Sequence, residues 1–585
     1  MELYLSTKGN DNANGSIDEP IKSIPEVLNR IKNSDEDVVV HLMEGVYRIE
    51  ESIVLEGMKN ITFRSYGESK VCISGAKELT FDNLDENDRE IFKNNPYIEK
   101  IKVAKLNKKV SQSAYGDAIP FGIGFPIVLK NGNPIEISRF PKDKYLKAKN
   151  VNGKQFSCEE TKDFVFEEMW YFGYPRWEWS DLVCSVEKNG STFELERESW
   201  SPLSEDSNYY FMNTADNLME NEWVISFKNN KIYFCGDAEK IEFPYFEEAF
   251  VKTVDCENVT FEDITFEMTR GNGVENIRGK NVCYKNCTFQ YISGSAVVFG
   301  LNDTPEGYYY GYMGDGGVNS GIENCRIYYT GTGGAYIAGG DRDTLTRCGN
   351  YVKGCDIEKF SVLATTYRPG VRLSGVGCKA IGNKIHDASH MGLGYEGNEH
   401  IIEGNEIYDV LKFSDDAAAI YTGNDWTACG TVIRNNYIHH ITSGIGEHGT
   451  FAIYIDDCSG TTEICGNYFE GVPCAFCLHG GRNMNVHDNV IKDSDKAFLL
   501  LHHHPDLVEK NRKILIERMK RINISNKAWD KYSMIRDIPE DEPMEPKYNR
   551  VYNNVLIKTP FGRVDESVEV NGEIDKGFCM AGNQT

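Results

Sequence analysis

Residues 378–409 read CKAIGNKIHDASHMGLGYEGNEHIIEGNEIYD, and this stretch decides the fold. It contains one unit twice: a short apolar run, a turn with Gly and Asn, an isoleucine and then polar residues. The anchors Asn383 and Asn405 are 22 residues apart, and a second strand-like run, GLGY (392–395), lies between the two units. Short β-like runs that recur at a fixed period predict a solenoid in which each repeat forms one coil.

The same unit recurs from about residue 258 to the end of the chain, with loops of varying length between copies. No leucine ladder accompanies it, so a leucine-rich repeat is not indicated. The pattern predicts an all-β fold, a right-handed parallel β-helix whose coils stack about 4.8 Å apart. The anchor positions are Ile264, Cys287, Cys325, Cys355, Asn383, Asn405, Asn436, Asn467, Asn489 and Asn554.

Three regions interrupt the repeat and suggest a division of the chain. Residues 1–99, which include the helix-like run IPEVLNRIKN (24–33), are predicted to form an N-terminal cap and the first coils. Residues 100–245 show β-alternation without the repeat and are predicted to form an inserted β-sandwich-like domain. Residues 246–585 are predicted to form the main β-helix, with a charged helical excursion over 505–547.

Composition excludes some classes of partner. The formal net charge is −26, and so acidic a surface disfavours nucleic acid and anionic membranes. The opening MELYLSTKG (1–9) has no basic segment leading into an apolar stretch, so neither a signal peptide nor a membrane span is predicted and a cytoplasmic protein is expected. The 32 Tyr, 29 Phe and 7 Trp suit stacking on sugar rings, although a large core needs aromatic residues too.

The 17 cysteines are scattered, and several occupy anchor positions of the repeat. They are predicted to be small buried residues in a reducing compartment. Cys474 and Cys477 have C-x-x-C spacing but no second pair, so no zinc or redox site is expected there. His502, His503 and His504 form a cluster without a nearby set of Cys or His partners. No metal and no cofactor are therefore predicted.

The most unusual stretch is SDDAAAIYTGNDWT (414–427), which is followed one coil later by FAIYIDD (451–457) and then by FCLHGG (476–481). Alignment on Ala-Ile-Tyr stacks Tyr421 on Tyr454 and Gly423 on the first aspartate of the Asp-Asp pair. This register predicts that Asp425, Asp456 and Asp457 lie at the same end of one sheet, with His479 one coil further on. The candidate catalytic residues are Asp416, Asp425, Asp456 and Asp457.

Carboxylates stacked about 5 Å apart are costly unless they are protonated, bound to a cation or used in catalysis. Cleavage of a glycosidic bond needs a proton donor with a raised pKa and a second carboxylate as base or nucleophile. A carboxyl separation of about 5–5.5 Å suits a retaining mechanism and about 6.5–9.5 Å an inverting one. Calcium binding and simple capping of turns are the alternatives for the same cluster.

Further side chains at or beside the same strand column are expected to bind sugar hydroxyls or to line sugar subsites. Residues in this set combine charge, imidazole and aromatic rings, which are the groups that sugar sites use. The candidate substrate-binding residues are Arg372, His390, Glu396, Tyr421, Trp426, Tyr454 and His479.

Several segments resemble a known group of enzymes. The runs DDAAAIYTGNDWTACGTVIRNNYIHHI (415–441) and AIYIDDCSGTTEICGNYF (452–469) resemble glycoside hydrolase family 141, which includes α-L-fucosidases and xylanases. The β-xylosidases of family 120 share the architecture. The resemblance implies that Asp416 and Asp457 are the two catalytic aspartates. One departure is Ala418, which stands where the family usually has glycine.

The resemblance and the strand register disagree about the partner of Asp457. Asp416 is eight residues out of register with Asp457, and a straight strand would place them more than about 20 Å apart. Either the chain bends sharply around residues 417–419, or Asp425 is the partner. Both alternatives stay open at this stage.

Three functions are compatible with these features. The first is a glycosidase that cleaves a neutral sugar linkage in imported oligosaccharides, with exo-action favoured. The second is a polysaccharide lyase or epimerase, which needs a cation to neutralise a uronate, and the site column offers mainly Arg372. The third is a non-catalytic carbohydrate-binding β-helix. The expected partner is an oligosaccharide, without nucleic acid or membrane, and assembly of several copies of the chain stays open.

Overall fold

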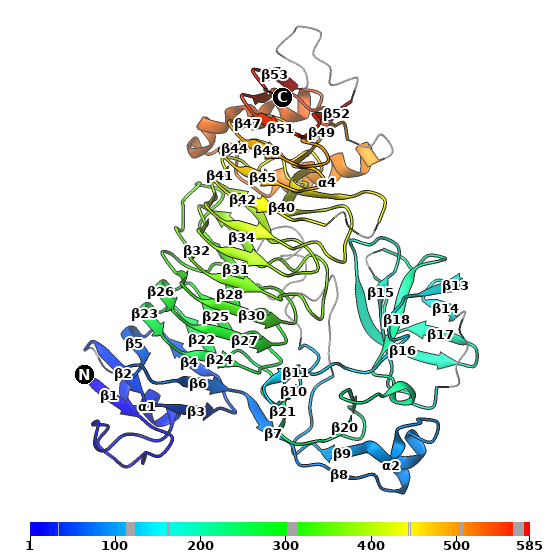
Figure 1. Ribbon diagram of the computed structural model, residues 1–585. Coiled ribbons are helices and arrows are strands. Elements are labelled where there is room, and N and C mark those ends of the chain that lie inside the picture. The colour runs from blue at the N-terminus through cyan, green and yellow to red at the C-terminus, as the bar shows by residue number, and fades with distance from the viewer. Residues whose placement is uncertain are drawn as a thin grey trace.

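The structure is a computed structural model of the chain, shown in Figure 1. It describes residues 1–585 except 33, 35, 113–122, 159, 161–163, 200, 301–313, 443, 445, 504–506, 566–577 and 585. His504 therefore lies outside the described residues. Stacked coils form a long solenoid, and a second body of antiparallel strands stands beside it (Figure 1).

Three long parallel sheets form the solenoid within the described part of the chain. The first sheet has 14 strands, from β1 (Glu2–Leu5) to β53 (Phe578–Ala581), and the third has 12, from β3 (Gly45–Arg48) to β51 (Val555–Ile557). The second sheet also has 12 strands and carries the candidate site. Its strands are β4 (Ile53–Glu56), β22 (Val251–Val254), β25 (Val274–Ile277), β28 (Val297–Phe299), β31 (Ala335–Gly339), β34 (Val371–Val376), β37 (Leu393–Asn398), β40 (Ala417–Gly423), β43 (Thr450–Asp456), β46 (Phe476–His479), β49 (Phe498–Leu501) and β52 (Gly562–Val564).

Apolar side chains at equivalent positions stack along the axis and form the core. In the first sheet, β38 (Ile401–Glu403), β41 (Val432–Arg434) and β44 (Glu463–Cys465) pair in parallel. This register stacks Ile402, Ile433 and Ile464, each fully buried. Every coil thus buries the face that a single repeat would leave exposed to water.

The anchor asparagines form a hydrogen-bonded ladder at the turn between the first and third sheets. The Nδ2 of Asn405 donates to Asn436 Oδ1 at 2.9 Å and to the carbonyl of Ala380 at 3.0 Å. The same pattern links Asn436 to Asn467. Because buried amides need partners, the repeat of Asn in sequence becomes a continuous chain of satisfied groups. In the earlier coils Cys287, Cys325 and Cys355 are buried at this place.

The inserted part begins earlier than residue 100. The strand β7 (Ala76–Glu78) leaves the solenoid and pairs antiparallel with β21 (Ile241–Pro244). Likewise β9 (Ile101–Lys105) pairs with β20 (Lys231–Cys235). The first and last strands of the insert therefore form antiparallel pairs with each other before the chain returns to the coils at β22.

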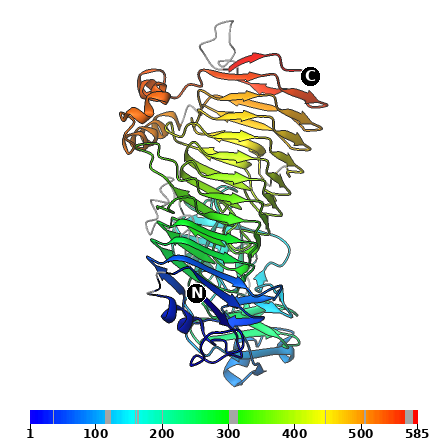
Figure 2. The same ribbon diagram turned by 90° about the vertical axis from the view of Figure 1, so that its left-hand side faces the viewer.

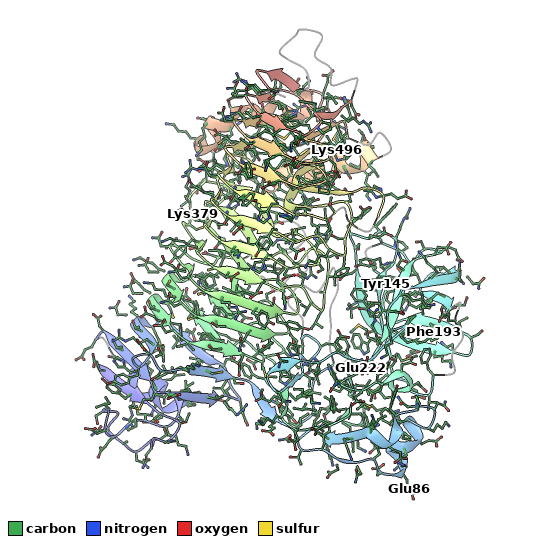
Figure 3. The ribbon with its side chains drawn as sticks, in the orientation of Figure 1. Glu86, Tyr145, Phe193, Glu222, Lys379 and Lys496 are labelled. Atoms are coloured by element: carbon green, nitrogen blue, oxygen red, sulfur yellow. The ribbon has the colours of Figure 1, made fainter. Side chains whose placement is uncertain are left out.

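The body of the insert is a small closed barrel rather than an open sandwich. Its seven strands follow the order β12-β18-β13-β14-β17-β16-β15, and a further pairing of β18 with β15 closes the sheet. Phe156, Tyr209 and Phe211 fill the interior, while Figure 3 places the labelled Tyr145 and Phe193 in the same body. The strands are β12 (Arg139–Phe140), β13 (Leu146–Asn152), β14 (Gln155–Cys158), β15 (Trp170–Tyr174), β16 (Leu182–Asn189), β17 (Thr192–Leu195) and β18 (Asn208–Met212).

Helices lie at both ends of the solenoid. Near the N-terminus, α1 (Ile24–Ile31) buries its apolar face on the first coils. Near the C-terminus, α4 (Val508–Lys520) and the 3₁₀ segment η4 (Lys527–Glu540) cover one side of the late coils (Figure 2). None of the helices in the described ranges has the length and apolarity needed to cross a membrane.

Candidate active site

The strands of the second sheet have the register that the sequence predicts. In β40 and β43, Tyr421 pairs with Tyr454 and Gly423 pairs with Asp456. His479 ends the next strand, β46. The carboxylates of Asp456 and Asp457 therefore stand at the end of one strand, with the imidazole beside them.

A bend in β40 brings Asp416 to the same place. Ala419 and Ile420 both belong to the inner core, whereas Ala418 and Tyr421 pack in an outer cluster with Phe451. In a straight strand, successive side chains point to opposite faces of the sheet. Two successive inward side chains break this alternation, so β40 bends at this point. As a result, the Tyr454 hydroxyl acts on the carboxyls of both Asp416 and Asp456 and lowers the pKa of each.

Asp456 is the buried, ionised member of the group. Its Oδ2 accepts from the Tyr421 hydroxyl at 2.9 Å, and its Oδ1 accepts from His479 Nδ1 at 2.8 Å. Burial alone would raise the pKa of Asp456, but hydrogen bonding and the charge of His479, with the two tyrosine hydroxyls, hold this pKa below its ordinary value. The same contact raises the pKa of His479 against the opposing effect of burial.

The two flanking carboxyls behave in the opposite way. Burial, followed by the negative charge of Asp456, raises the pKa of Asp457 to about 7. The same two causes raise the pKa of Asp416 to about 6. A carboxyl next to another negative charge in a poorly solvated place keeps its proton longer. The three aspartates therefore comprise one fixed anion and two groups that can hold a proton near neutral pH.

Both flanking aspartates have a left-handed backbone. Asp416 has φ +45° just before β40, and Asp457 has φ +42° just after β43. Such conformations disfavour most side chains, although Asp and Asn tolerate them better than other residues with a β-carbon. Asn is therefore the suitable probe of either carboxylate, because it keeps the shape and the backbone preference.

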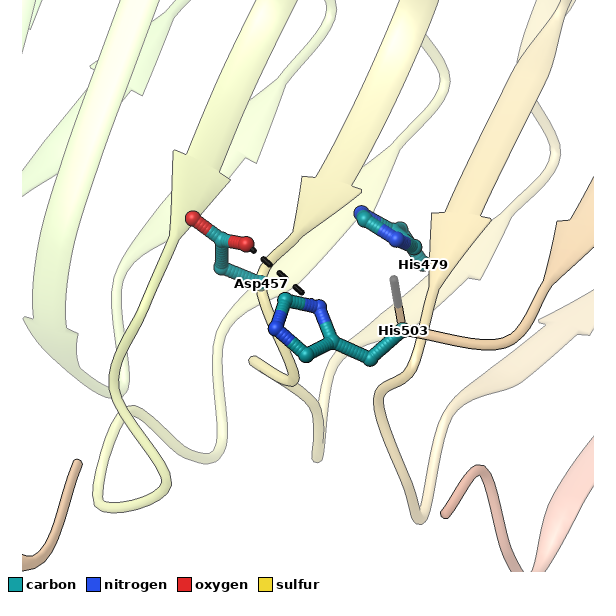
Figure 4. A group of neighbouring side chains, drawn as sticks. All are labelled: Asp457, His479 and His503. Carbon is teal, nitrogen blue, oxygen red and sulfur yellow. Dashed lines mark ion pairs between the residues drawn. The ribbon is translucent and has the colours of Figure 1, made fainter. Parts of the chain in front are cut away.

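Asp457 has two further neighbours: His503, which follows β49 (Figure 4), and Asn511 on α4 of the helical excursion. Asn511, on α4, donates from Nδ2 to Asp457 Oδ1 at 3.1 Å and faces His503 Nε2 at 3.0 Å. Because Nε2 accepts from this amide, the proton of a neutral His503 lies on Nδ1. That nitrogen is 3.6 Å from Asp457 Oδ1, so the fully buried His503 ring packs against the carboxylate on its inner side.

Asp457, His479 and His503 each offer a ligand atom, and these atoms lie within 4.8 Å of one another. A metal ion would need an unprotonated His503 Nδ1, which requires the Asn511 amide to turn its oxygen toward the Asp457 carboxylate. Calcium, which prefers six to eight oxygen ligands, does not suit a set with two imidazoles. The hydrogen bonds therefore fit an acid–base site better than a metal site.

Asp425 is held elsewhere. Its Oδ2 lies 2.9 Å from Arg342, and its Oδ1 accepts from the Thr427 hydroxyl at 2.6 Å. Burial would raise the pKa of Asp425, but Arg342 and Thr427 together hold it below its ordinary value. Its carboxylate is committed to this ion pair, whereas the charge of Asp416 acts on Asp457.

Two other candidate residues are not at the surface of the site. Trp426 is 2% exposed and packs with Trp529 and Leu515, because the helical excursion covers it. His390 is completely buried beside the Tyr367 ring. Burial, with the charge of Arg368, lowers the pKa of His390 to about 3, so it is a neutral core residue. Neither can contact a sugar in this arrangement.

Arg372 and Glu396 form an ion pair in the neighbouring coils, with Nε and Oε2 at 3.2 Å. Arg372 pairs in register with Gly394, which in turn pairs with Tyr421. The ion pair therefore stands in the columns of the site, but Arg372 is three coils and Glu396 two coils away from Asp456. Its charges are mutually neutralised, and its polar atoms can still meet a sugar that extends along the sheet.

Sequence reasoning missed a contribution from the inserted barrel. Trp177 and Trp179 stack at 4.8 Å, and the ring of His448 lies 5.6 Å from Trp179. His448 Nδ1 is 3.0 Å from Asp415 Oδ2, next to Asp416 in the chain. The only signal in the sequence is PRWEWS (175–180), which places two tryptophans in a short polar run.

Comparisons with known proteins agree with the fold. A family model described as the right handed beta helix region matches residues 312–491. The solenoid is a right-handed β-helix. The fold predicted from the repeat is thus confirmed, and no curated protein matches the chain.

Solved structures with the same fold include one titled as a glycoside hydrolase, with TM-score 0.63 and 14% identity over 88% of this chain and 98% of that one. A complex of XylC with xylose matches with TM-score 0.40 and 12% identity over 82% of this chain and 75% of that one. A GH136 lacto-N-biosidase from Eubacterium ramulus matches with TM-score 0.39 and 11% identity, over 86% and 68% respectively. At these identities the likeness concerns the fold alone.

Proposed function

We propose that the protein is a glycoside hydrolase in which Asp457 donates a proton to the glycosidic oxygen and Asp416 acts as base or nucleophile. The observation that carries this proposal is the set of contacts that holds a buried Asp456 carboxylate against Tyr421 and His479 at 2.9 and 2.8 Å. Burial, together with the charge of this carboxylate, raises the pKa of Asp457 to about 7 and that of Asp416 to about 6. Two titratable groups whose surroundings separate their pKa values are the usual basis of acid and base roles in one site.

Each neighbour has a part in this chemistry. His479 and Tyr421 keep Asp456 ionised, and its charge delays the ionisation of the two flanking carboxyls. Asn511 fixes the orientation of Asp457. Between about pH 6 and pH 7, Asp416 is the more ionised and Asp457 the more protonated of the two carboxyls. This is the protonation state that glycosidic cleavage needs.

The site favours a neutral sugar. The arginine that would neutralise a uronate, Arg372, is already paired with Glu396. This arrangement disfavours a lyase or epimerase. The resemblance of the Asp-Ala-Ala-Ala-Ile-Tyr and Tyr-Ile-Asp-Asp elements to family 141 suggests α-L-fucosides or β-D-xylosides as substrates. The whole-chain likeness to a structure titled as a glycoside hydrolase supports the same reaction class.

A screen of aryl glycosides, with α-L-fucoside and β-D-xyloside foremost, tests the proposal. We expect release of the aryl group by the natural protein and its loss in Asp457→Asn. The matched control is Asp493→Asn, because Asp493 also follows a strand with φ +46° but lies outside the site. Full activity of Asp457→Asn would overturn the proposal. An unsaturated uronate product from a polyuronate would favour the lyase instead.

A further inference from the structure

The loop of the inserted barrel that carries the two tryptophans is fixed against the solenoid at both ends. It joins β15 to β16. Before the loop, the Tyr174 hydroxyl donates to the carbonyl of Phe413 at 2.8 Å. After it, Asp181 accepts from the hydroxyls of Thr365 and Thr366 at 3.0 and 2.9 Å. Phe413 lies three residues before Asp416, so the clamp holds the loop beside the candidate site.

The positions of the rings show what surrounds the tryptophan pair. Trp177 and Trp179 are nearly parallel, at 8°, and the Arg176 guanidinium lies 4.8 Å from the Trp177 ring. His448 is 6.1 Å from Trp177 and 5.6 Å from Trp179, nearly perpendicular to both. Since these two distances are similar, His448 lies beside the stack and not on its axis. Trp177 thus lies between Arg176 and Trp179, whereas Trp179, which is half-buried, has Trp177 on one of its faces and His448 at its side.

His448 connects this pair to the reacting carboxyls. Asp415, which is fully buried, binds the His448 ring and also accepts from the backbone amides of His448 and Gly449 at 2.8 and 2.7 Å. Burial and the charge of Asp456 raise the pKa of Asp416, and the charge of His448 is the largest influence that lowers it. The tryptophan pair therefore stands next to a group whose charge is felt at Asp416.

We propose that Trp179, backed by Trp177, forms a sugar-binding subsite that takes a unit one position beyond the two groups joined by the scissile bond. The ligand class is a neutral pyranose ring in an oligosaccharide, which would lay its C–H face on the indole. A large rigid ring that is already stacked and clamped loses little conformational freedom on binding. The inference rests on the proposed function only for the position of the bond between Asp416 and Asp457.

Binding without turnover tests the subsite. Titration calorimetry of Asp457→Asn with xylobiose, xylotetraose and a fucosylated trisaccharide gives the affinity of each probe. In the double variant with Trp179→Ala, we expect about a tenfold loss of affinity for the probes that bind, which corresponds to about 1.4 kcal/mol. Trp179→Phe should restore part of the loss. Arg176→Ala, on the far side of the stack, is the control and should change affinity less than twofold.

Kinetics on the active protein distinguishes a role of Trp179 in binding the sugar from a role in cleaving the bond. Trp179→Ala should raise KM for oligosaccharides and leave kcat/KM for an aryl monoglycoside unchanged. The inference is wrong if Trp179→Ala binds every probe like its parent, if no probe binds, or if the monoglycoside suffers equally. If the probes bind through Trp179 but nothing is hydrolysed, the subsite stands and the proposed hydrolase fails.

Discussion

Two groups of aspartates occupy the same edge of the second sheet, and their surroundings differ. Asp425 lies against Arg342 and Thr427, and its charge is neutralised by a direct ion pair. Asp416 and Asp457 lie beside another carboxylate, Asp456, and their pKa values rise. The comparison teaches that the position of an aspartate on the sheet does not determine its role. The role depends on the charged or polar side chain that contacts the aspartate.

The largest expected effect separates the two groups by activity. Asp457→Asn should lower kcat/KM on the cleaved aryl glycoside by about a thousandfold, because a missing proton donor typically costs that order of rate. Asp425→Asn should retain most activity per folded molecule. Steady-state kinetics on both proteins measures the difference, and equal losses would remove the distinction drawn between the two groups.

The second effect concerns stability, and here we expect the larger loss in Asp425→Asn and not in Asp457→Asn. Asp425→Asn leaves Arg342 without its charged partner in a largely buried place, which should lower the free energy of unfolding by about 3 kcal/mol. Because the pKa of Asp425 is depressed in the folded state, this contribution is present above its unfolded pKa and disappears as pH falls through the folded value. Denaturant unfolding at pH 7 and near pH 3 tests both statements.

The third effect is a gain in stability when Asp457 is replaced. The folded pKa of Asp457, about 7, exceeds its unfolded value, so ionisation at higher pH destabilises the folded state. Asp457→Asn removes that penalty and should stabilise the protein at pH 8 by at least about 1 kcal/mol, while leaving it nearly unchanged at pH 4. Thermal melts of the two proteins at both pH values provide the measurement. A variant that is less stable at pH 8 contradicts the electrostatic assignment.

The smallest effect is a shift of the pH profile. In the natural protein, kcat/KM should rise as Asp416 loses its proton near pH 6 and fall as Asp457 loses its proton near pH 7. Asp456→Asn removes the nearby negative charge, so both limbs should move to lower pH. The limbs should stay above the ordinary carboxyl range, since burial is the larger cause of each shift. Movement of either limb to higher pH disagrees with this account.

The sequence predicts the solenoid well because its determinants are local and repeated. The Asn anchors at 383, 405 and 436 mark one turn per coil, and their amides form the ladder that the spacing implies. The stacking of Tyr421 on Tyr454 follows from the same regularity. Where each coil repeats the last, aligning two strands is enough to place their side chains.

The rest depends on contacts that no local pattern carries. Three alanines in a row fit either face of a strand, so the inward pair Ala419–Ile420 and the bend it marks cannot be read from residue types. Trp426 lies beside the candidate aspartates in sequence but is covered by Trp529, about a hundred residues later in the chain. Trp179 is far from the motif in sequence and is brought to it by the insert. Tertiary packing decided all three.

The support of Asp457 by Asn511 and His503 has a consequence for biosynthesis. A solenoid can assemble coil by coil as the chain emerges, since each coil contacts mainly its neighbours. The proposed catalytic carboxyls would then be in place while the ribosome is still making the excursion that orients one of them. In a nascent chain, the coils of the site would be stacked, but Asp457 would lack its contact with Asn511. The proposed site would be complete only after residue 511 has been translated.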